Sequence, residues 1–144
     1  MAYTEYFDLY EKAQKKGHGM LLCLVDVKNS RTDNNYPLLR MKYIEAINKI
    51  AEKMNCIDIS KRTNLAIGKN IFVLGDAVGF VVETERKKDV DKDIIRLLKE
   101  LDINLTFHYD SSFFDTFDYV KGNEKYYFGY AIQQTESNAK KSNV

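Results

Sequence analysis

Two aspartates follow apolar segments in a way that could bring their carboxylates together. Gly75-Asp76 stands between two apolar runs within residues 70–82. Only these two residues are left for a turn, which is typical of a tight β-hairpin. Asp26 directly follows the apolar run 20–25. If the two strands are neighbours, Asp26 and Asp76 form a two-carboxylate site at the edge of a buried sheet.

A pair of carboxylates on a rigid sheet is a usual support for Mg²⁺ or Mn²⁺. Mg²⁺ takes few acidic ligands, keeps several waters and completes its shell with substrate phosphates. Two such ions can activate an attacking hydroxyl and neutralise a leaving pyrophosphate. A structural interpretation is equally open at this point, because aspartate is common in turns and at strand ends. In that case Asp76 only forms the turn, and Asp26 caps a loop or is solvated.

The elements that must position these acids follow from hydrophobic periodicity. Apolar residues recur at helical spacing over 3–16, which predicts an N-terminal helix within residues 1–17. The same spacing predicts helices over 37–54 and 87–101. Segment 20–27 is apolar without alternation, as expected for a central strand that is covered on both faces.

The remaining segments give shorter strands. Residues 56–59 and 65–67 are ambiguous and could each form a short strand. Residues 103–109 alternate between apolar and polar side chains, which predicts a half-buried strand followed by a loop over 110–123. A second aromatic run at 126–132 precedes a polar tail, frayed over 135–144.

This order of elements predicts an α+β fold. We expect a ferredoxin-like or palm-type sandwich, in which helices pack on a mixed sheet with a central antiparallel hairpin. The chain of 144 residues suits a single domain over 1–144, and we find no internal repeat or linker.

Composition narrows the class of protein. The chain is 44% hydrophobic and 30% charged with a net charge of +1, which indicates a folded globule without a strong field for nucleic acid or an anionic membrane. It has no apolar run of about 20 residues, the length of a membrane span, and no secretory pattern at its start. Cys23 and Cys56 have neither metal-ligand spacing nor the density of a disulfide scaffold. We therefore expect a cytoplasmic protein.

Four segments resemble class III nucleotidyl cyclases, and they occur in that family's order. Segment 25–30 is similar to the family's first metal-binding strand, and segment 74–80 to its Gly-Asp hairpin. Segment 105–109 is similar to a later strand, and segment 127–133 to its Phe-Gly element. The resemblance covers about residues 18–137. The small SatD-type proteins of this cyclase-like group share the Asp-hydrophobic-x-x-Ser-Arg start that residues 26–31 show.

The resemblance implies a site and a reaction. Asp26 and Asp76 would bind Mg²⁺ or Mn²⁺, with the Val27 carbonyl as a further ligand. Backbone N–H groups of the following loop would contact a nucleoside triphosphate; the loop residues are Lys28, Asn29 and Ser30. A ribose 3′-hydroxyl would attack the α-phosphate, giving a cyclic nucleotide and pyrophosphate. Because the family's sites lie between two subunits, a homodimer is expected.

The chain also departs from the family's pattern. Gln133 stands where active members carry an asparagine that orients the ribose, and Ser137 where they carry an arginine that stabilises the transition state. Asn70 and Tyr126 occupy the positions of the base-reading lysine and its partner acid, and Asn70 offers both a donor and an acceptor. These departures keep a second hypothesis open: a cyclase-fold module without turnover that binds nucleotide or a protein partner in a regulatory role.

Other polar residues have a structural interpretation first. His108 lies on an alternating strand and is expected to be a framework residue. Arg31 and Arg40 could reach phosphates from the segment after Asp26, but a solvated helix or loop face accounts for them more simply.

Overall fold

The computed structural model describes residues 19–60 and 63–113 of the chain. The predicted N-terminal helix, the aromatic run at 126–132 and the tail lie outside these residues. The elements in order are β1 (Gly19–Val27), α2 (Tyr36–Lys53), β2 (Ala66–Ile67), β3 (Ile71–Leu74), β4 (Ala77–Thr84), α3 (Lys87–Lys99) and β5 (Phe107–Phe113).

The strands form one five-stranded sheet in the order β2-β3-β4-β1-β5. The predicted α+β class is confirmed. The sheet differs from the expected mixed one, since every pairing among the described strands is antiparallel. The cause lies in the two helical crossovers. The β1-α2-β3 unit leaves room for β4 between its strands, and the β4-α3-β5 unit leaves room for β1, so no two parallel strands are neighbours.

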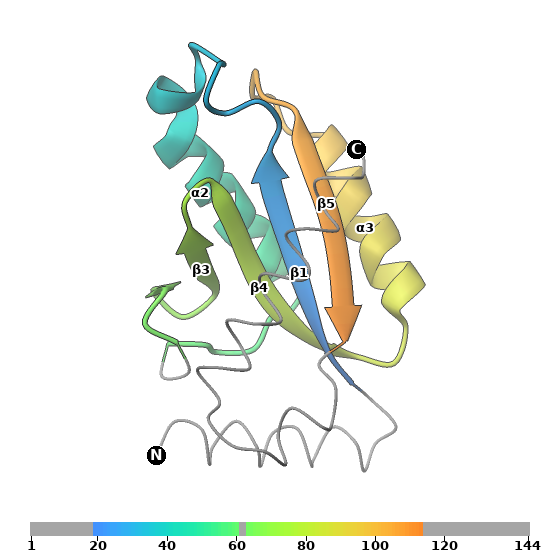
Figure 1. The fold of residues 1–144 in the computed structure, drawn as a ribbon. Helices are drawn as coiled ribbons and strands as arrows, with labels where there is room; N and C mark the ends of the chain where they lie inside the picture. The colour runs from blue at the N-terminus through green and yellow to red at the C-terminus, as the bar shows by residue number, and fades with distance from the viewer. Residues whose placement is uncertain (1–18, 61–62, 114–144) are drawn as a thin grey trace.

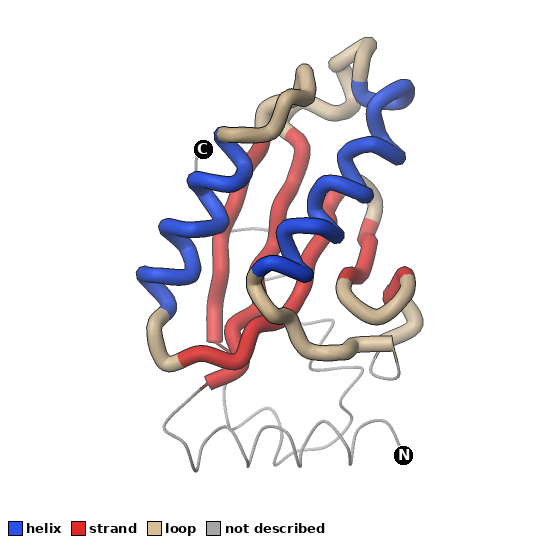
Figure 2. Tube along the Cα trace, turned by 180° about the vertical axis from the view of Figure 1, so that it is seen from behind, coloured by secondary structure: helices blue, strands red, loops and turns tan. Residues whose placement is uncertain are grey.

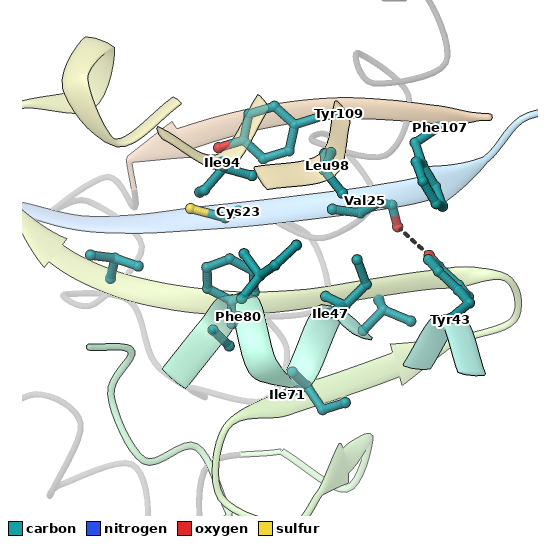
Figure 3. Close-up of a cluster of buried hydrophobic side chains, with 14 of the residues drawn as sticks. Cys23, Val25, Tyr43, Ile47, Ile71, Phe80, Ile94, Leu98, Phe107 and Tyr109 are labelled. Carbon is teal, nitrogen blue, oxygen red and sulfur yellow. Dashed lines mark hydrogen bonds between the residues drawn. The ribbon is translucent and has the colours of Figure 1, made fainter. Parts of the chain in front are cut away.

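Both described helices cover the same face of this sheet (Figures 1 and 2). Helix α2 buries Tyr43, Ile47 and Ile50 against it, and α3 buries Val90, Ile94 and Leu98. Figure 3 shows several of these side chains meeting Phe80 of β4 and Tyr109 of β5. The larger of two buried clusters in the described part therefore lies between the helices and the sheet.

Strand β1 is buried on both faces, as its unbroken apolar sequence predicts. Leu21, Cys23 and Val25 join the core under the helices, while the alternating residues Met20, Leu22 and Leu24 join a second cluster that includes Phe72 and Val81. By this alternation, Asp26 belongs to the face away from the helices. The carboxylate thus continues an otherwise apolar row.

Several predicted boundaries are confirmed and two are not. The helices over 37–54 and 87–101 and the hairpin agree with α2, α3 and β3–β4. Strand β5 begins at Phe107 and continues to Phe113, although 103–106 was expected in the strand and 110–113 in a loop. The β1–β5 ladder begins at Val27 opposite Phe107, and the N–H of Leu105 turns back to the Ile103 carbonyl oxygen at 2.8 Å. Alternation alone does not locate that turn.

Segment 56–59 forms no strand. The Ile57 N–H donates to the Val81 carbonyl oxygen at 2.9 Å, and the Ile59 N–H to that of Lys69 at 2.9 Å. These single bonds attach the segment to two different parts of the fold. A strand at 65–67 is confirmed in shortened form as β2. Neither described helix is long and apolar enough to cross a membrane.

Candidate functional site

A pocket of about 660 Å³ lies where the end of β1, the loop after it, the β3–β4 turn and β5 meet. Both acids singled out in the sequence line it, together with three of their predicted companions. The full lining is Asp26, Val27, Asn29, Ser30, Arg31, Thr32, Leu74, Gly75, Asp76 and His108. The structure therefore brings together segments that are about 50 and 80 residues apart in the chain.

Asp26 reaches the pocket as a buried carboxylate on β1, with 2% of its surface exposed. Burying a carboxylate is costly unless it is hydrogen-bonded. The Val27 N–H donates to Asp26 Oδ1 at 3.0 Å. In the β1–β5 ladder Asp26 is directly opposite His108, so the two side chains share one face of the sheet. Aspartate is rarely buried to this extent in proteins, so a carboxylate at the end of a buried strand is a candidate functional group.

Asp76 occupies the two-residue turn that joins β3 to β4, where Leu74 pairs with Ala77. Gly75 has a φ of 62°, the left-handed region that such a turn requires at its first central position. The carboxylate of Asp76 accepts a hydrogen bond from the Ser30 hydroxyl. The guanidinium of Arg40, on α2, lies 3.4 Å from the Gly75 carbonyl oxygen. The turn is thus held by the loop after β1, through Ser30, and by α2, through Arg40.

The loop after β1 folds tightly over the pocket. Asn29 has a φ of 57°, a conformation that asparagine tolerates better than most residues. Its carbonyl oxygen accepts the N–H groups of Thr32 at 3.0 Å and Asp33 at 2.9 Å. The Lys28 N–H donates to the Thr106 carbonyl oxygen at 2.8 Å, which anchors the loop beside β5. This geometry sets Ser30 opposite Asp76.

A tyrosine of α2 contacts the main chain of both acid-bearing segments. The Tyr43 hydroxyl lies 3.1 Å from the Val25 carbonyl oxygen and 2.9 Å from the Asp76 carbonyl oxygen. Burial, followed by the negative charge of Asp26, raises the pKa of Tyr43 well above its usual value. The hydroxyl therefore keeps its proton and remains a donor.

Sequence analysis favoured a structural interpretation for two residues that line the pocket and assigned no role to a third that supports it. His108 was expected to be a framework residue, and a solvated face was preferred to a phosphate contact for Arg31. Tyr43 falls within the helix predicted over 37–54, without a separate role. Arg31 is exposed and still lines the pocket. The alternation of His108 with Phe107 and Tyr109 indicates that its side chain lies on the opposite face of the strand from theirs. The sequence of this strand alone does not give the register with β1, which sets His108 opposite Asp26.

Two of the predicted nucleotide-binding residues are placed differently. Lys28 is not among the residues that line the pocket. Asn70 precedes β3, at the opposite end of that strand from the turn, and its amide nitrogen lies 3.3 Å from both Asn48 Oδ1 and Glu52 Oε1 of α2. The structure therefore does not bring Asn70 to the two acids. Tyr126, Gln133 and Ser137 lie outside the described residues.

Comparisons with protein-family models, curated proteins and solved structures gave no match. Within residues 19–60 and 63–113, no group of three or more His, Cys, Asp or Glu side chains could hold a metal ion. The oxygen donors at the pocket are the carboxylates of Asp26 and Asp76, with hydroxyl and main-chain groups around them, and His108 and Arg31 also line it. This oxygen-rich set suits a hard cation such as Mg²⁺, provided that phosphate and water oxygens complete the shell.

Proposed function

We propose that this protein is a metal-dependent nucleotidyl cyclase-like enzyme, which converts a nucleoside triphosphate to a cyclic nucleotide and pyrophosphate. The observation that carries the proposal is the shared pocket of Asp26 and Asp76, which come from neighbouring antiparallel strands and their turn. Support also comes from the element order, which, apart from the two-residue strand β2, agrees with the β-α-β-β-α-β order expected for a ferredoxin-like or palm-type sandwich. The resemblance of segments 25–30 and 74–80 to the cyclase motifs agrees with both.

In this proposal the two carboxylates hold Mg²⁺ or Mn²⁺, with the Val27 carbonyl as a further ligand. The bound ions would polarise the α-phosphate and neutralise the leaving pyrophosphate. The loop of Asn29 and Ser30 would present N–H groups to the phosphate oxygens, and Arg31 would add positive charge at the pocket. The ribose 3′-oxygen would bond to the α-phosphorus as the bond to the β-phosphate oxygen breaks, and the hydroxyl proton would pass to water.

A second candidate is a module that binds nucleotide in a regulatory role without turning it over. Gln133 and Ser137 favour it, because they replace the asparagine and arginine of active cyclases. Loss of a donor that stabilises transition-state charge commonly lowers the rate by about 100-fold or more. The two candidates share the metal site and differ only in turnover.

The oligomer and compartment follow from the same resemblance and composition. We propose a cytoplasmic homodimer, since cyclase sites lie between subunits and both cysteines, Cys23 and Cys56, are free thiols. A second copy would then supply the groups that read the base, a role that Asn70 does not fill at this pocket.

The test is to incubate the purified full chain with Mn²⁺ and each of the four nucleoside triphosphates. Pyrophosphate and cyclic nucleotide should appear in equal amounts from at least one of them. Asp26→Asn and Asp76→Asn should each lower the rate by about 100-fold or more. Asp93→Asn is a matched control, since Asp93 is an exposed carboxylate on α3.

Each outcome decides between the candidates. Binding that disappears in Asp76→Asn, without pyrophosphate release, would support the regulatory module. If calorimetry shows no response to any nucleotide or to Mn²⁺, both candidates are wrong.

A further inference from the structure

The hydrogen-bonded ladder between β1 and β4 stops short of the two acids. Its last pair is Val25 opposite Val78. Asp26 and Asp76 both lie beyond that pair, Asp26 in the last residues of β1 and Asp76 in the turn before β4. Ladder bonds between these two strands therefore do not set the separation of the two acids. Contacts outside this ladder, among them the hydrogen bond from Ser30 to Asp76, hold the turn against the end of β1.

Tyr43 supplies such a contact from α2. Its hydroxyl lies 3.1 Å from the carbonyl oxygen of Val25, the residue before Asp26, and 2.9 Å from that of Asp76 itself. Figure 3 shows the side chain pointing from α2 to Val25, with this hydrogen bond drawn as a dashed line. One hydroxyl therefore joins the two main-chain segments that carry the acids.

The ring of Tyr43 is fixed by the core around it. The residue is fully buried, and its ring stacks on that of Phe107 with centroids 5.6 Å apart and planes inclined by 19°. A closely packed interior allows such a side chain little movement. The hydroxyl is thus a rigid reference point for the β3–β4 turn.

We propose that Tyr43 is a positioning residue, which sets the spacing of Asp26 and Asp76 for a divalent cation. This inference rests on the proposed function. Groups that orient metal ligands without touching the ion typically change metal affinity by 10- to 100-fold when they are mutated. The conservative change Tyr43→Phe keeps the stacked ring and removes only the hydroxyl.

The test is to titrate the full chain with Mn²⁺ alone and follow binding by water-proton relaxation. Tyr43→Phe should weaken Mn²⁺ binding by about 10-fold. Amide exchange at Gly75, Asp76 and Ala77 should also become faster. Tyr109→Phe is the matched control, because Tyr109 is also buried and its hydroxyl donates to Asp91 of α3 at 2.6 Å, away from the two acids. Its Mn²⁺ affinity should remain within twofold of the wild type, even where its melting temperature falls.

The results separate this inference from the proposed function. If the wild-type chain does not bind Mn²⁺ alone, the role of Tyr43 is overturned. If the wild-type chain also responds to no nucleotide, the proposed function is overturned as well. If the wild type binds and Tyr43→Phe binds equally tightly, or if Tyr109→Phe loses as much affinity, only the role of Tyr43 is overturned. Should Tyr43→Phe fail to fold, Phe107→Leu removes the stacked ring and keeps the hydroxyl. That variant should then show a several-fold weaker affinity, and an unchanged affinity would count against the inference.

Discussion

The hydroxyl of Ser30 donates a hydrogen bond to the carboxylate of Asp76, across 46 positions of the chain. This contact joins the loop after β1 to the β3–β4 turn. Only one carboxylate oxygen of Asp76 accepts this hydrogen bond. Asp76 lines the same pocket as Asp26. The loop, the turn and the two acids therefore form one structural unit.

We expect Ser30→Ala to lower the free energy of unfolding by about 1 kcal/mol, because Asp76 loses a hydrogen bond. Ser30→Thr should restore most of that loss, since it keeps a hydroxyl. Urea denaturation measures both changes. Ser60→Ala is the control: its hydroxyl bonds the nearby Asp58 at 2.6 Å on the exposed surface, and its removal should matter less. Equal stability of Ser30→Ala and Ser30→Thr would contradict the prediction.

Asp91 attaches α3 to β5. Its Oδ1 accepts the hydroxyls of Tyr109 at 2.6 Å and Ser111 at 2.5 Å, and its Oδ2 lies 2.8 Å from the ammonium of Lys87. We expect Asp91→Ala to destabilise the fold by about 2–4 kcal/mol, since two buried hydroxyls lose this acceptor.

Thermal unfolding followed by circular dichroism would measure the loss at Asp91. Asp93→Ala, on the exposed side of the same helix, should change stability by less than about 0.5 kcal/mol, because its ion pair with Arg96 is long and solvated. A similar effect of the two alanine variants would show that Asp91 does not hold α3 in the way described.

Gly79 has no space for a side chain in β4. A Cβ there would lie 2.3 Å from the ring of Phe72 and 2.8 Å from the carbonyl oxygen of Cys23. Gly79→Ala should therefore destabilise the protein by about 1–3 kcal/mol through overpacking. Phe72→Leu removes part of the clash, so the double variant should lose less stability than the sum of the two single variants. Strict additivity in urea denaturation would contradict this explanation.

Cys56 should react slowly with thiol reagents. Burial, and then the negative charge of Glu52, raise its pKa to about 11. Only the thiolate reacts, so at pH 8 about one molecule in a thousand is reactive. The rate of iodoacetamide labelling should rise about tenfold per pH unit between pH 8 and 10, until the pKa is approached.

Glu52→Gln gives the matching control for Cys56, because it removes the nearby negative charge. Its labelling at pH 8 should be faster than that of the wild type. Cys23 should stay unlabelled in the folded protein, since deep burial raises its pKa even further. Rapid labelling of Cys56 at pH 7 would show that its thiol is less shielded than the structure indicates.

Local sequence patterns determined much of this fold. The Gly75-Asp76 turn, the amphipathic faces of α2 and α3, and the two-sided burial of β1 are confirmed. Each depends on residues within one turn or one run, where backbone preference and hydrophobic periodicity act together. The predicted start and end of β5 were both wrong, because this strand is defined by its pairing with β1, and this pairing begins at Val27, 80 residues earlier.

Only the tertiary structure decided what lies together at the pocket. The sequence suggested that Asp26 and Asp76 could meet, but the pairing of β1 with β4 is a long-range choice that no local pattern contains. The pairing of β1 with β5 sets His108 opposite Asp26, and the packing of α2 brings Tyr43 to the main chain of Asp76. Asn70 stays at the other end of β3, near Asn48 of α2. The sequence by itself therefore determined the elements and the chemistry of the two acids. Strand order and register, which depend on contacts between distant segments, decided which side chains surround them.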